Sequence, residues 1–375
     1  MGTATQTMHM AAKPYIEPYR QPEESRHDLP WADLITLDLS QFEYPGGKQK
    51  LANQLKDAVH NVGFFYITGF GLSQEAIDRQ FAIGRDVLNM PTEEKLKYRA
   101  DLEGGSYNGY RPLGSVEVYP GLPDNNEASI SSPMYNMFKF IPYGEREHPQ
   151  IVQQHREEIE QFQRKIAEDV VQKLLVLMSI LLELPEDYLS NGHRYNDTSD
   201  CHLRYMIYRA RTPEENAKYK DIYIGGHSDF GSLTLLFRQP IAALQIKTSS
   251  GEWKWVKPYP ESITVNIADI LQFWTNGYLK SSIHRVVAPP PDQAGQDRLG
   301  LLYFLRPAHN LNLKTVDSPL LRRLGLKTDE PTDADDLKAG DWVQKRVAQN
   351  LEGSSKDGQG DKVVLNGLKA KYGHD

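Results

Sequence analysis

The stretch from Cys201 to Pro307 constrains the possible fold more than any other part of the chain. Short apolar or β-branched runs follow one another here, and turn residues separate them. This is the pattern of neighbouring strands in an all-β unit. The runs read HLRYMIYR, LTLLF, ALQIKT, WKWVKP, SITVNI, DILQFW, YLKSSIHRVV and LGLLYFLRP, and Asn276-Gly277 is typical of a hairpin turn between two of them. So many strands without intervening helices predict two sheets closed into a jelly roll, a double-stranded β-helix.

The segments before this core predict helices that flank it. Helices are expected over residues 46–63 and 73–88, with a strand over 64–71 between them. After Pro149, apolar residues at helical spacing predict a long buried helix. Residues 101–145 are rich in Gly, Asn, Pro and Tyr, which predicts long loops of the kind that line a site. The predicted fold class is therefore α+β, with a jelly-roll core and flanking helices.

We divide the chain into four regions. Residues 1–30 are rich in polar residues and Pro without periodicity, and form an irregular N-terminal arm. Residues 31–150 form an N-terminal region that includes the loop segment, and residues 151–310 contain the long helix and the jelly roll. Residues 311–375 form a C-terminal extension, in which a helix over 333–351 precedes a Gly-, Ser- and Lys-rich end without regular structure.

Composition limits the compartment and the partners. The formal net charge is −7 and Lys and Arg do not cluster, so nucleic acid is not expected as a partner. The longest apolar run, residues 174–184, is too short to span a bilayer, so no membrane partner is expected. Cys201 is the single cysteine and can form neither a disulfide nor a thiolate cluster within the chain, which favours a cytoplasmic location. No oligomeric state is predicted.

Candidate metal ligands occur in the sequence GGHSDFGS at residues 225–232. In an extended strand, side chains two residues apart share a face, so His227 and Asp229 can present a nitrogen and an oxygen to one point. His284, inside another predicted strand, is a candidate third ligand. Two His and one carboxylate on one face are the ligands of non-haem Fe(II) oxygenases. His-x-Asp alone is weak evidence, because this spacing also arises by chance in polar stretches.

Arg298 begins the run RLGLLYFLRP, fourteen residues after His284. An isolated arginine that faces a core needs an anion. A guanidinium at this point could hold a carboxylate of a co-substrate through two parallel hydrogen bonds.

These motifs and their surroundings resemble the isopenicillin N synthase-like dioxygenases, a family that includes plant flavonoid and gibberellin oxidases and many fungal biosynthetic enzymes. The resemblance covers residues 30–310 and includes LPWADLITLDLS, DAVHNVGFFYITGFGL and the sequence from GSLTLLF to SSIHRV. It implies that residues 31–150 are an N-terminal dioxygenase region and that residues 151–310 are the catalytic core.

The resemblance also implies a cofactor set. His227, Asp229 and His284 would bind Fe(II), and Arg298 would pair with the distal carboxylate of the co-substrate 2-oxoglutarate, with O2 as the oxidant. One departure matters, since the family usually has Arg-x-Ser and this chain has Gly300 at the Ser position. Loss of that hydrogen bond would cost about 1–3 kcal/mol if nothing replaced it.

Further binding residues are expected on one face of the strand LRYMIYRA. Alternation places Arg204 and Tyr208 on the same face, and Tyr208 falls where the family's Asn-Tyr-Tyr-Pro motif has its co-substrate tyrosine. Tyr208 is a candidate 2-oxoglutarate ligand or a barrel-packing residue. Arg204 is a candidate for binding the prime substrate or a member of a structural ion pair. Tyr110 and Phe230 are further candidates for contact with the substrate.

The activity implied by the resemblance is hydroxylation, desaturation or oxidative rearrangement of a small organic molecule, in secondary metabolism, with release of succinate and CO2. Three alternatives remain. An oxidase of the same fold without 2-oxoglutarate is favoured by Gly300 and disfavoured by Arg298. An ethylene-forming type of enzyme and a non-catalytic small-molecule-binding barrel are the others. The remaining histidines, among them His193 and His202, are expected at surface or capping positions.

Overall fold

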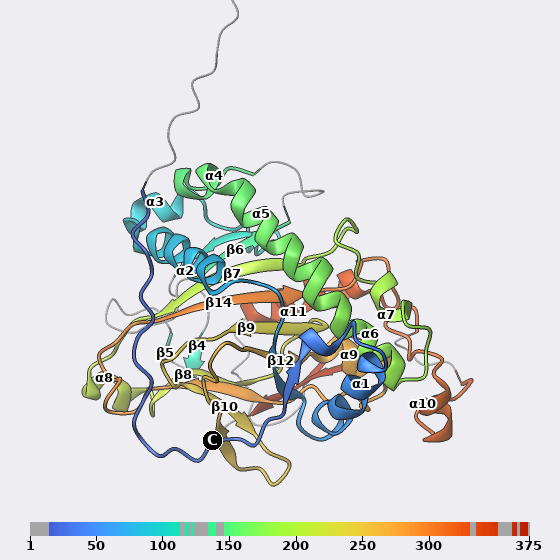
Figure 1. Ribbon diagram of the computed structural model, residues 1–375. Coiled ribbons are helices and arrows are strands. Elements are labelled where there is room, and N and C mark those ends of the chain that lie inside the picture. The colour runs from blue at the N-terminus through green and yellow to red at the C-terminus, as the bar shows by residue number, and fades with distance from the viewer. Residues whose placement is uncertain are drawn as a thin grey trace, which may run out of the picture.

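Two facing β-sheets form the centre of the computed structural model (Figure 1). The structure describes residues 15–112, 117–119, 122–123, 134–139, 146–330, 335–351, 362–365 and 368–373. In spatial order, the larger sheet contains β1 (Thr36–Asp38), β2 (Phe64–Thr68), β12 (Ile263–Ile267), β9 (Leu233–Phe237), β14 (Arg298–Leu305), β7 (His202–Tyr208), β6 (Met134–Phe138) and β3 (Gly109–Arg111). The smaller sheet contains β11 (Trp253–Trp255), β10 (Leu244–Lys247), β13 (His284–Val287), β8 (Ile222–His227) and β17 (Tyr372–Gly373). Two short hairpins, β4 (Glu117–Tyr119) with β5 (Leu122–Pro123) and β15 (Lys362–Leu365) with β16 (Leu368–Ala370), lie outside these sheets.

The jelly roll is confirmed by the order in which the chain visits the two sheets. β7 belongs to the larger sheet, β8 to the smaller and β9 to the larger, and the alternation continues through β10, β12, β13 and β14. All pairings in this core are antiparallel. Strand β11 is the exception, since it pairs with β10 in the smaller sheet. Because the other strands of the core alternate between the sheets, residues far apart in sequence face one another across a common interior.

Helices cover the outer face of the larger sheet, where α2, α5 and α6 lie across it in Figure 1. The helices are α1 (Gly47–Asp57), α2 (Gln74–Asn89), α3 (Thr92–Leu96), α4 (Gln150–Gln154), α5 (Arg156–Lys165), α6 (Gln172–Leu181), α7 (Tyr188–Asn191), α8 (Pro213–Lys218), α9 (Asp269–Trp274), α10 (Pro319–Arg323) and α11 (Ala339–Leu351). A 3-10 turn, η1 (Leu39–Gln41), follows β1, and π-helical turns η2 (Ala58–Val62) and η3 (Ile166–Val171) continue α1 and α5. The predicted helices at residues 46–63 and 73–88 and after Pro149 are therefore present.

Alternation along β7 and β14 divides the interior into two parts. One face of each strand packs on the helices: Leu203, Tyr205 and Ile207 of β7, and Leu299, Leu301, Tyr303 and Leu305 of β14. The opposite face points between the two sheets: Arg204, Met206 and Tyr208 of β7, and Arg298, Leu302 and Phe304 of β14. On both strands, the face that carries the charged residues Arg204 and Arg298 is therefore the face that lines the pocket.

One predicted strand is wrong, because DILQFW forms helix α9. Ile270, Leu271 and Trp274 are buried at a spacing that suits one turn of helix, and such a short apolar run carries no periodicity that separates helix from strand. The predicted hairpin is wrong for the same reason. Asn276 and Gly277 have φ of 46° and 86°, and they end the helix instead of joining two strands.

The segment 101–145 is only partly the loop that was predicted. Tyr110 lies in β3 and Asn136 in β6, and these strands extend the larger sheet beyond β7. Residues 113–116, 120–121, 124–133 and 140–145 lie outside the described residues. The division of the chain into four regions stays a prediction, although strands from 31–150 and 151–310 share one sheet.

The C-terminal end contains more regular structure than predicted. Helix α11 lies within the expected range, and the chain then returns as β17 to the edge of the smaller sheet. There Tyr372 pairs with His227 and Gly373 with Gly226. The end of the chain is therefore a neighbour of the strand that carries a candidate metal ligand.

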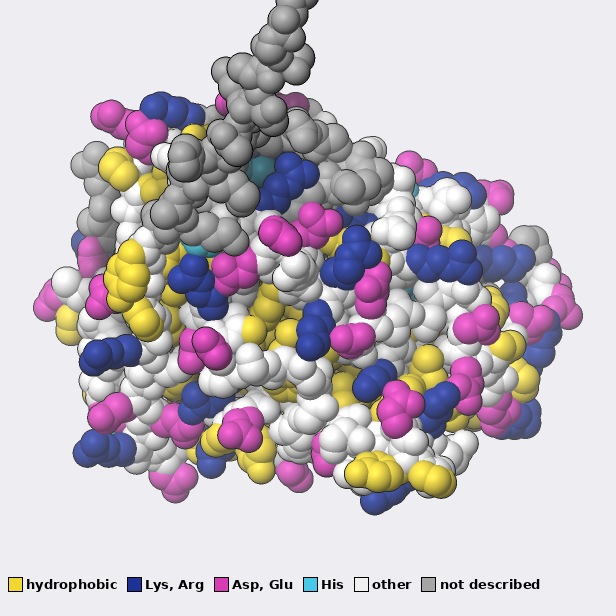
Figure 2. Space-filling model, turned by 45° about the horizontal axis from the view of Figure 1, so that its top comes forward, with side chains coloured by type: hydrophobic (Ala, Val, Ile, Leu, Met, Phe, Trp, Pro, Cys, Tyr) yellow, Lys and Arg dark blue, Asp and Glu magenta, His cyan; other side chains and the backbone are white. Residues whose placement is uncertain are grey.

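Charges of both signs are mixed over the face drawn in Figure 2, where Lys and Arg side chains of the described residues alternate with Asp and Glu. Within the described part of the chain, no helix is both long enough and apolar enough to cross a membrane.

Candidate metal centre and co-substrate pocket

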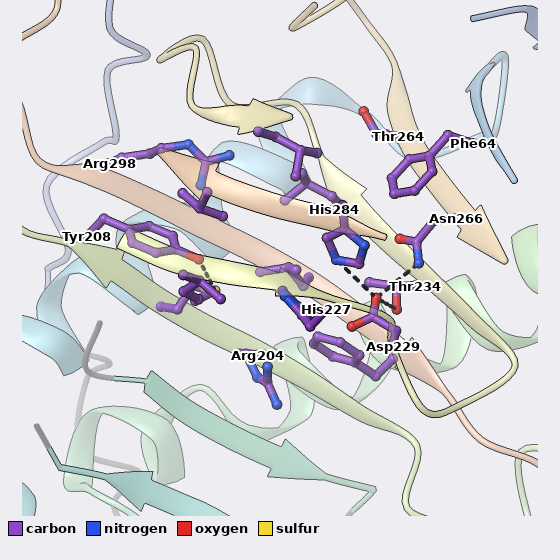
Figure 3. Close-up of a pocket in the computed structure, with 17 residues that line it drawn as sticks. Phe64, Arg204, Tyr208, His227, Asp229, Thr234, Thr264, Asn266, His284 and Arg298 are labelled. Atoms are coloured by element: carbon purple, nitrogen blue, oxygen red, sulfur yellow. Dashed lines mark hydrogen bonds and ion pairs between the residues drawn. The ribbon is translucent and has the colours of Figure 1, made fainter. Parts of the chain in front are cut away.

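A pocket opens between the two sheets of the jelly roll (Figure 3). Both sheets contribute to its wall. The lining residues are Phe64, Arg204, Met206, Tyr208, Ile224, His227, Asp229, Thr234, Leu236, Leu244, Thr264, Asn266, His284, Val286, Arg298, Leu302 and Phe304. About half are apolar, and the polar ones gather around His227, Asp229 and His284, with Arg298 and Arg204 further away (Figure 3).

The three candidate metal ligands meet at one point. His227 ends β8, His284 begins β13, and these two residues are direct partners in the antiparallel pairing of the strands. Asp229 lies just beyond the end of β8, so the turn after the strand, and not the strand itself, brings its carboxylate to the imidazoles. One potential ligand atom from each residue lies within 4.8 Å of the others.

Hydrogen bonds define which atoms are available to a metal. Nδ1 of His227 lies 2.9 Å from the carbonyl oxygen of Gly225, and Nδ1 of His284 lies 3.2 Å from that of Ser282. Because a carbonyl can only accept, each Nδ1 carries the proton and each Nε2 offers a lone pair to the pocket. Burial lowers the pKa of His227 to about 4, so its imidazole is neutral near pH 7.

The carboxylate of Asp229 is oriented in the same way. Its Oδ2 accepts hydrogen bonds from Oγ1 of Thr234 at 2.6 Å and from Nδ2 of Asn266 at 3.0 Å. Burial alone would raise the pKa of Asp229, but the two imidazoles and these hydrogen bonds outweigh burial and hold it below the usual range. An ionised carboxylate and two neutral imidazoles are the ligand forms that a divalent metal requires, and this donor set fits Fe(II).

Helix α9 fixes the turn between His227 and β9. The backbone N–H of Asp269 donates to the carbonyl of Asp229, and the N–H of Ile270 donates to that of Gly231, both at 2.8 Å. The side chain of Asp269 also accepts a hydrogen bond from Ser228, the residue between the two ligands, at 3.1 Å. The segment that was predicted as a strand is therefore a helix, and as a helix it positions the turn between the candidate ligands His227 and Asp229 and strand β9.

The C-terminal segment holds the same turn from the other side. The N–H of Ser228 donates to the carbonyl of Lys371 at 3.2 Å, in continuation of the β8–β17 pairing. Nζ of Lys371 donates to Oε1 of Gln272 at 2.6 Å and to the carbonyl of Ser281 at 2.9 Å, which ties the segment to α9 and to the chain before β13.

Arg298 and Tyr208 lie together at one end of the pocket (Figure 3). They are partners in the pairing of β14 with β7, and the guanidinium carbon lies 5.3 Å from the centre of the tyrosine ring. Nε of Arg298 donates to the carbonyl of Ile241 at 3.2 Å, and among the described residues no carboxylate lies within ion-pair distance of this guanidinium. Burial raises the pKa of Tyr208 to about 12, so its hydroxyl remains a donor.

Gly300 lies two residues after Arg298 on β14 and is the partner of Met206 in the pairing with β7. A Cβ added at Gly300 would approach Cγ of Met206 to 3.1 Å and Cδ1 of Leu302 to 3.4 Å. The sulfur of Met206 also lies 3.8 Å from the Tyr208 hydroxyl. Met206 therefore occupies the space beside the position where the family has a serine.

The other predicted contact residues separate into two groups. Arg204 lines the pocket, whereas Tyr110 and Phe230 are not among its lining residues. Tyr110 is 1% exposed and packs below the ammonium of Lys95. Phe230 follows Asp229 by one residue and points away from the ligands, toward the guanidinium of Arg306, whose carbon lies 4.4 Å from the ring centre.

Several polar residues of the site were missed in the sequence. Thr234 and Asn266 lie on inward-facing positions of β9 and β12, and a polar residue in an apolar strand is the signal that could have found them. The expectation of surface or capping positions for His193 and His202 is only partly right. Both are buried, and His193 bonds through Nδ1 to the Leu189 carbonyl of helix α7 and through Nε2 to Ser232, each at 2.7 Å. His202 does not lie at the surface, since it stacks on Phe304.

Comparisons with known proteins identify the family of the chain. The model of the 2OG-Fe(II) oxygenase superfamily matches residues 199–307, and the model described as non-haem dioxygenase in morphine synthesis N-terminal matches residues 34–161. A UPF0676 protein of Schizosaccharomyces pombe is 31% identical over 79% of this chain and 87% of its own length. Homoarginine-6-hydroxylase of Arabidopsis thaliana is 30% identical over 76% of this chain and 84% of its own.

Solved structures share the fold at lower identity. Neurospora crassa T7H in complex with alpha-ketoglutarate (2-oxoglutarate) and 5-formyluracil superposes with a TM-score of 0.70 and 19% identity, over 88% of this chain and 99% of that one. From the matched family models and the relatives that span most of its length, the chain belongs to the 2-oxoglutarate- and Fe(II)-dependent oxygenase superfamily, and it is an oxidoreductase that uses Fe(II), 2-oxoglutarate and O2.

Proposed function

We propose specific roles for the residues of this pocket. Fe(II) is bound by His227, Asp229 and His284, and 2-oxoglutarate is bound beside it by Arg298 and Tyr208. The observation that carries the proposal is that three donors with free ligand atoms and a buried guanidinium without a carboxylate partner among the described residues share one cavity. Fe(II) with 2-oxoglutarate supplies the oxidising power for O2 chemistry in this class of site.

The protein itself orients the metal ligands and keeps water out of the pocket. Hydrogen bonds to Nδ1 of both imidazoles and to Oδ2 of Asp229 hold the ligands before any metal arrives, which lowers the cost of binding. The apolar walls, among them Phe64, Leu236 and Leu302, keep water from the reacting atoms.

Arg298 and Tyr208 recognise the distal carboxylate of 2-oxoglutarate. The free face of the guanidinium can donate two parallel hydrogen bonds, and the Tyr208 hydroxyl is a further donor in reach of the same end of the pocket. In this arrangement Tyr208 takes over the hydrogen bond that a serine at Gly300 would supply. The free guanidinium also argues against an oxidase that dispenses with 2-oxoglutarate.

The prime substrate is a small organic molecule that contacts Arg204, and its hydroxylation, desaturation or rearrangement belongs to secondary metabolism. Relatives named for small substrates support a small molecule: one is a homoarginine hydroxylase, and one solved neighbour holds thymine. Tyr110 and Phe230 would act only by shaping the walls, since both lie behind the lining residues. Cys201 is buried, with its thiol donating to the Arg306 carbonyl at 3.1 Å, which is consistent with a reducing cytoplasmic location.

We also propose that the four regions have different parts in this function. Residues 151–310 supply the metal and co-substrate sites and most of the pocket wall, and residues 31–150 add Phe64 to that wall. The arm of residues 1–30 and the extension of residues 311–375 support this core, the extension through the pairing of β17 with β8.

The metal assignment predicts a loss of metal affinity when a ligand is removed. His284→Ala should weaken anaerobic Fe(II) binding by more than about a hundredfold, because loss of a direct ligand costs more than loss of a residue that supports one. Calorimetric titration of the metal measures this. His60→Ala is the matched control, since His60 bonds to the Tyr278 carbonyl away from the pocket, and it should bind the metal normally. Normal metal affinity in His284→Ala would remove His284 from the ligand set.

The co-substrate assignment predicts that Arg298→Gln weakens 2-oxoglutarate binding by roughly tenfold to a hundredfold, because the substitution removes hydrogen bonds from a charged donor. Fe(II) should still bind. Titration of 2-oxoglutarate into the anaerobic Fe(II) enzyme, together with succinate release in air, checks both parts. Arg285→Gln, on the outer side of β13 near Trp253, is the control. Unchanged 2-oxoglutarate affinity in Arg298→Gln would sink this proposal.

The packing of Gly300 against Met206 predicts a coupled pair of substitutions. Gly300→Ser alone should bind 2-oxoglutarate no better than the natural chain, because the new Cβ crowds Met206. In a Met206→Ala background, which removes the crowding, Gly300→Ser should strengthen binding by about fivefold to tenfold through one more hydrogen bond. Additive effects of the two substitutions would show that Met206 does not block a serine at position 300.

The β8–β17 pairing predicts that the end of the chain supports metal binding. Removal of residues 371–375 should weaken Fe(II) affinity by about tenfold, because Ser228 loses its backbone partner beside both ligands. Removal of residues 374–375 alone leaves the pairing intact and is the control. Equal metal affinity in the two shortened proteins, with equal thermal stability, would contradict a supporting role for β17.

A further inference from the structure

Arg204 and Arg298 are the two arginines that line the pocket. Arg204 takes no part in the proposed binding of Fe(II) or of 2-oxoglutarate. It lies in the middle of β7, on the same face as Tyr208. In Figure 3 its guanidinium lies on the side of His227 and Asp229 away from His284, at a distance from Arg298. Its side chain is only partly buried, and its exposed part faces the cavity.

The guanidinium is held in a fixed orientation. Its Nε donates to Oδ1 of Asn136 at 2.6 Å, and Nη2 lies 3.4 Å from Nε2 of His202. Nδ1 of His202 lies 2.8 Å from the carbonyl of Asp200 and must carry the proton, so Nε2 is the acceptor for Arg204. The flat face of the guanidinium lies over the ring of Phe304, 4.2 Å from its centre.

These contacts leave donors unused. A guanidinium has five N–H groups, and Asn136 and His202 accept from two of them. The N–H groups of Nη1 and the second one of Nη2 remain for the pocket. Among the described residues no carboxylate lies within ion-pair distance of them, and the nearest acid on the pocket wall, Asp229, already accepts from Thr234 and Asn266.

The charge of Arg204 is also uncompensated by its surroundings. Burial, together with the positive charges of Arg111 and Arg306, lowers the pKa of Arg204 to about 10, so it remains charged near pH 7. In the loaded pocket, the charges of Fe(II) and Arg298 balance those of Asp229 and the two carboxylates of 2-oxoglutarate. Among the charged residues that line the pocket, Arg204 is then the one left without a counter-charge, and an unpaired charge inside a protein is costly.

We infer that the prime substrate carries a carboxylate group, which Arg204 binds through its free N–H groups, with the apolar remainder of the substrate against Phe304 and Leu302. This inference rests on the proposed function. A monoanion balances the charge that remains on the pocket lining, whereas a phosphate dianion would leave a surplus negative charge there. The planar fork of the guanidinium also matches the geometry of a carboxylate.

The test compares matched probes on the anaerobic enzyme loaded with Fe(II) and 2-oxoglutarate. Phenylacetate and decanoate are each compared with the corresponding primary amide, and phenyl phosphate is the dianionic probe; calorimetry measures affinity. We expect at least one carboxylate to bind roughly tenfold to a hundredfold more tightly than its amide, and phenyl phosphate to bind more weakly than phenylacetate. In Arg204→Gln this preference should vanish while the affinity for the amide remains.

Two further variants separate this role from a structural one. Arg204→Lys keeps the charge without the planar fork and should retain part of the preference, which decides the matter if Arg204→Gln does not fold. Arg26→Gln, at an exposed position, should behave as the natural chain. Equal affinity for carboxylates and amides, absence of carboxylate binding, tighter binding of phenyl phosphate, or a preference that survives in Arg204→Gln would each overturn the inference. Failure of 2-oxoglutarate to bind before any probe is added would instead overturn the proposed function.

Discussion

The antiparallel pairing of β8 with β13 is the interaction on which the site depends. It places His227 directly opposite His284, so that two imidazoles from positions far apart in the sequence become neighbours in one ladder. The ring centres are 4.4 Å apart, and their Nδ1 atoms are each bonded to a backbone carbonyl two residues earlier. The ligand geometry is therefore a property of the backbone register. A shift of one residue in this pairing would turn one imidazole out of the pocket.

The turn that carries Asp229 depends on elements outside the two paired strands. Helix α9 binds the carbonyls of this turn with its first N–H groups, and β17 binds Ser228 from the opposite side. Asp269 connects this turn to the chain just before β13, because its carboxylate accepts hydrogen bonds from the hydroxyls of Ser228 and Ser281. Burial raises the pKa of Asp269 to about 6, the cost of placing an acid where it can hold both segments.

The pocket combines two arginines with the candidate metal centre, and the two guanidiniums have different neighbours. Arg298 lies beside Tyr208, and Met206 fills the space opposite Gly300. Arg204 is fixed by Asn136 and by a neutral, buried His202. The side chains that orient the two guanidiniums thus come from β6 and β7, which connects the substrate end of the pocket to the N-terminal half of the chain.

The sequence by itself predicted the jelly roll and the flanking helices and named His227, Asp229, His284 and Arg298 as candidates, because strand alternation, helical spacing and the types of ligand residue are local properties. It did not determine that DILQFW is a helix, since a short apolar run fits either structure until its neighbours are known. Nor did it determine the burial of His202, the place of Tyr110 and Phe230 behind the pocket wall, or the return of the C-terminal segment to β8. These depend on which segments meet across the two sheets, and only the tertiary structure decides such contacts. The tertiary structure also explains Gly300, because Met206 occupies the space that a side chain at this position would need.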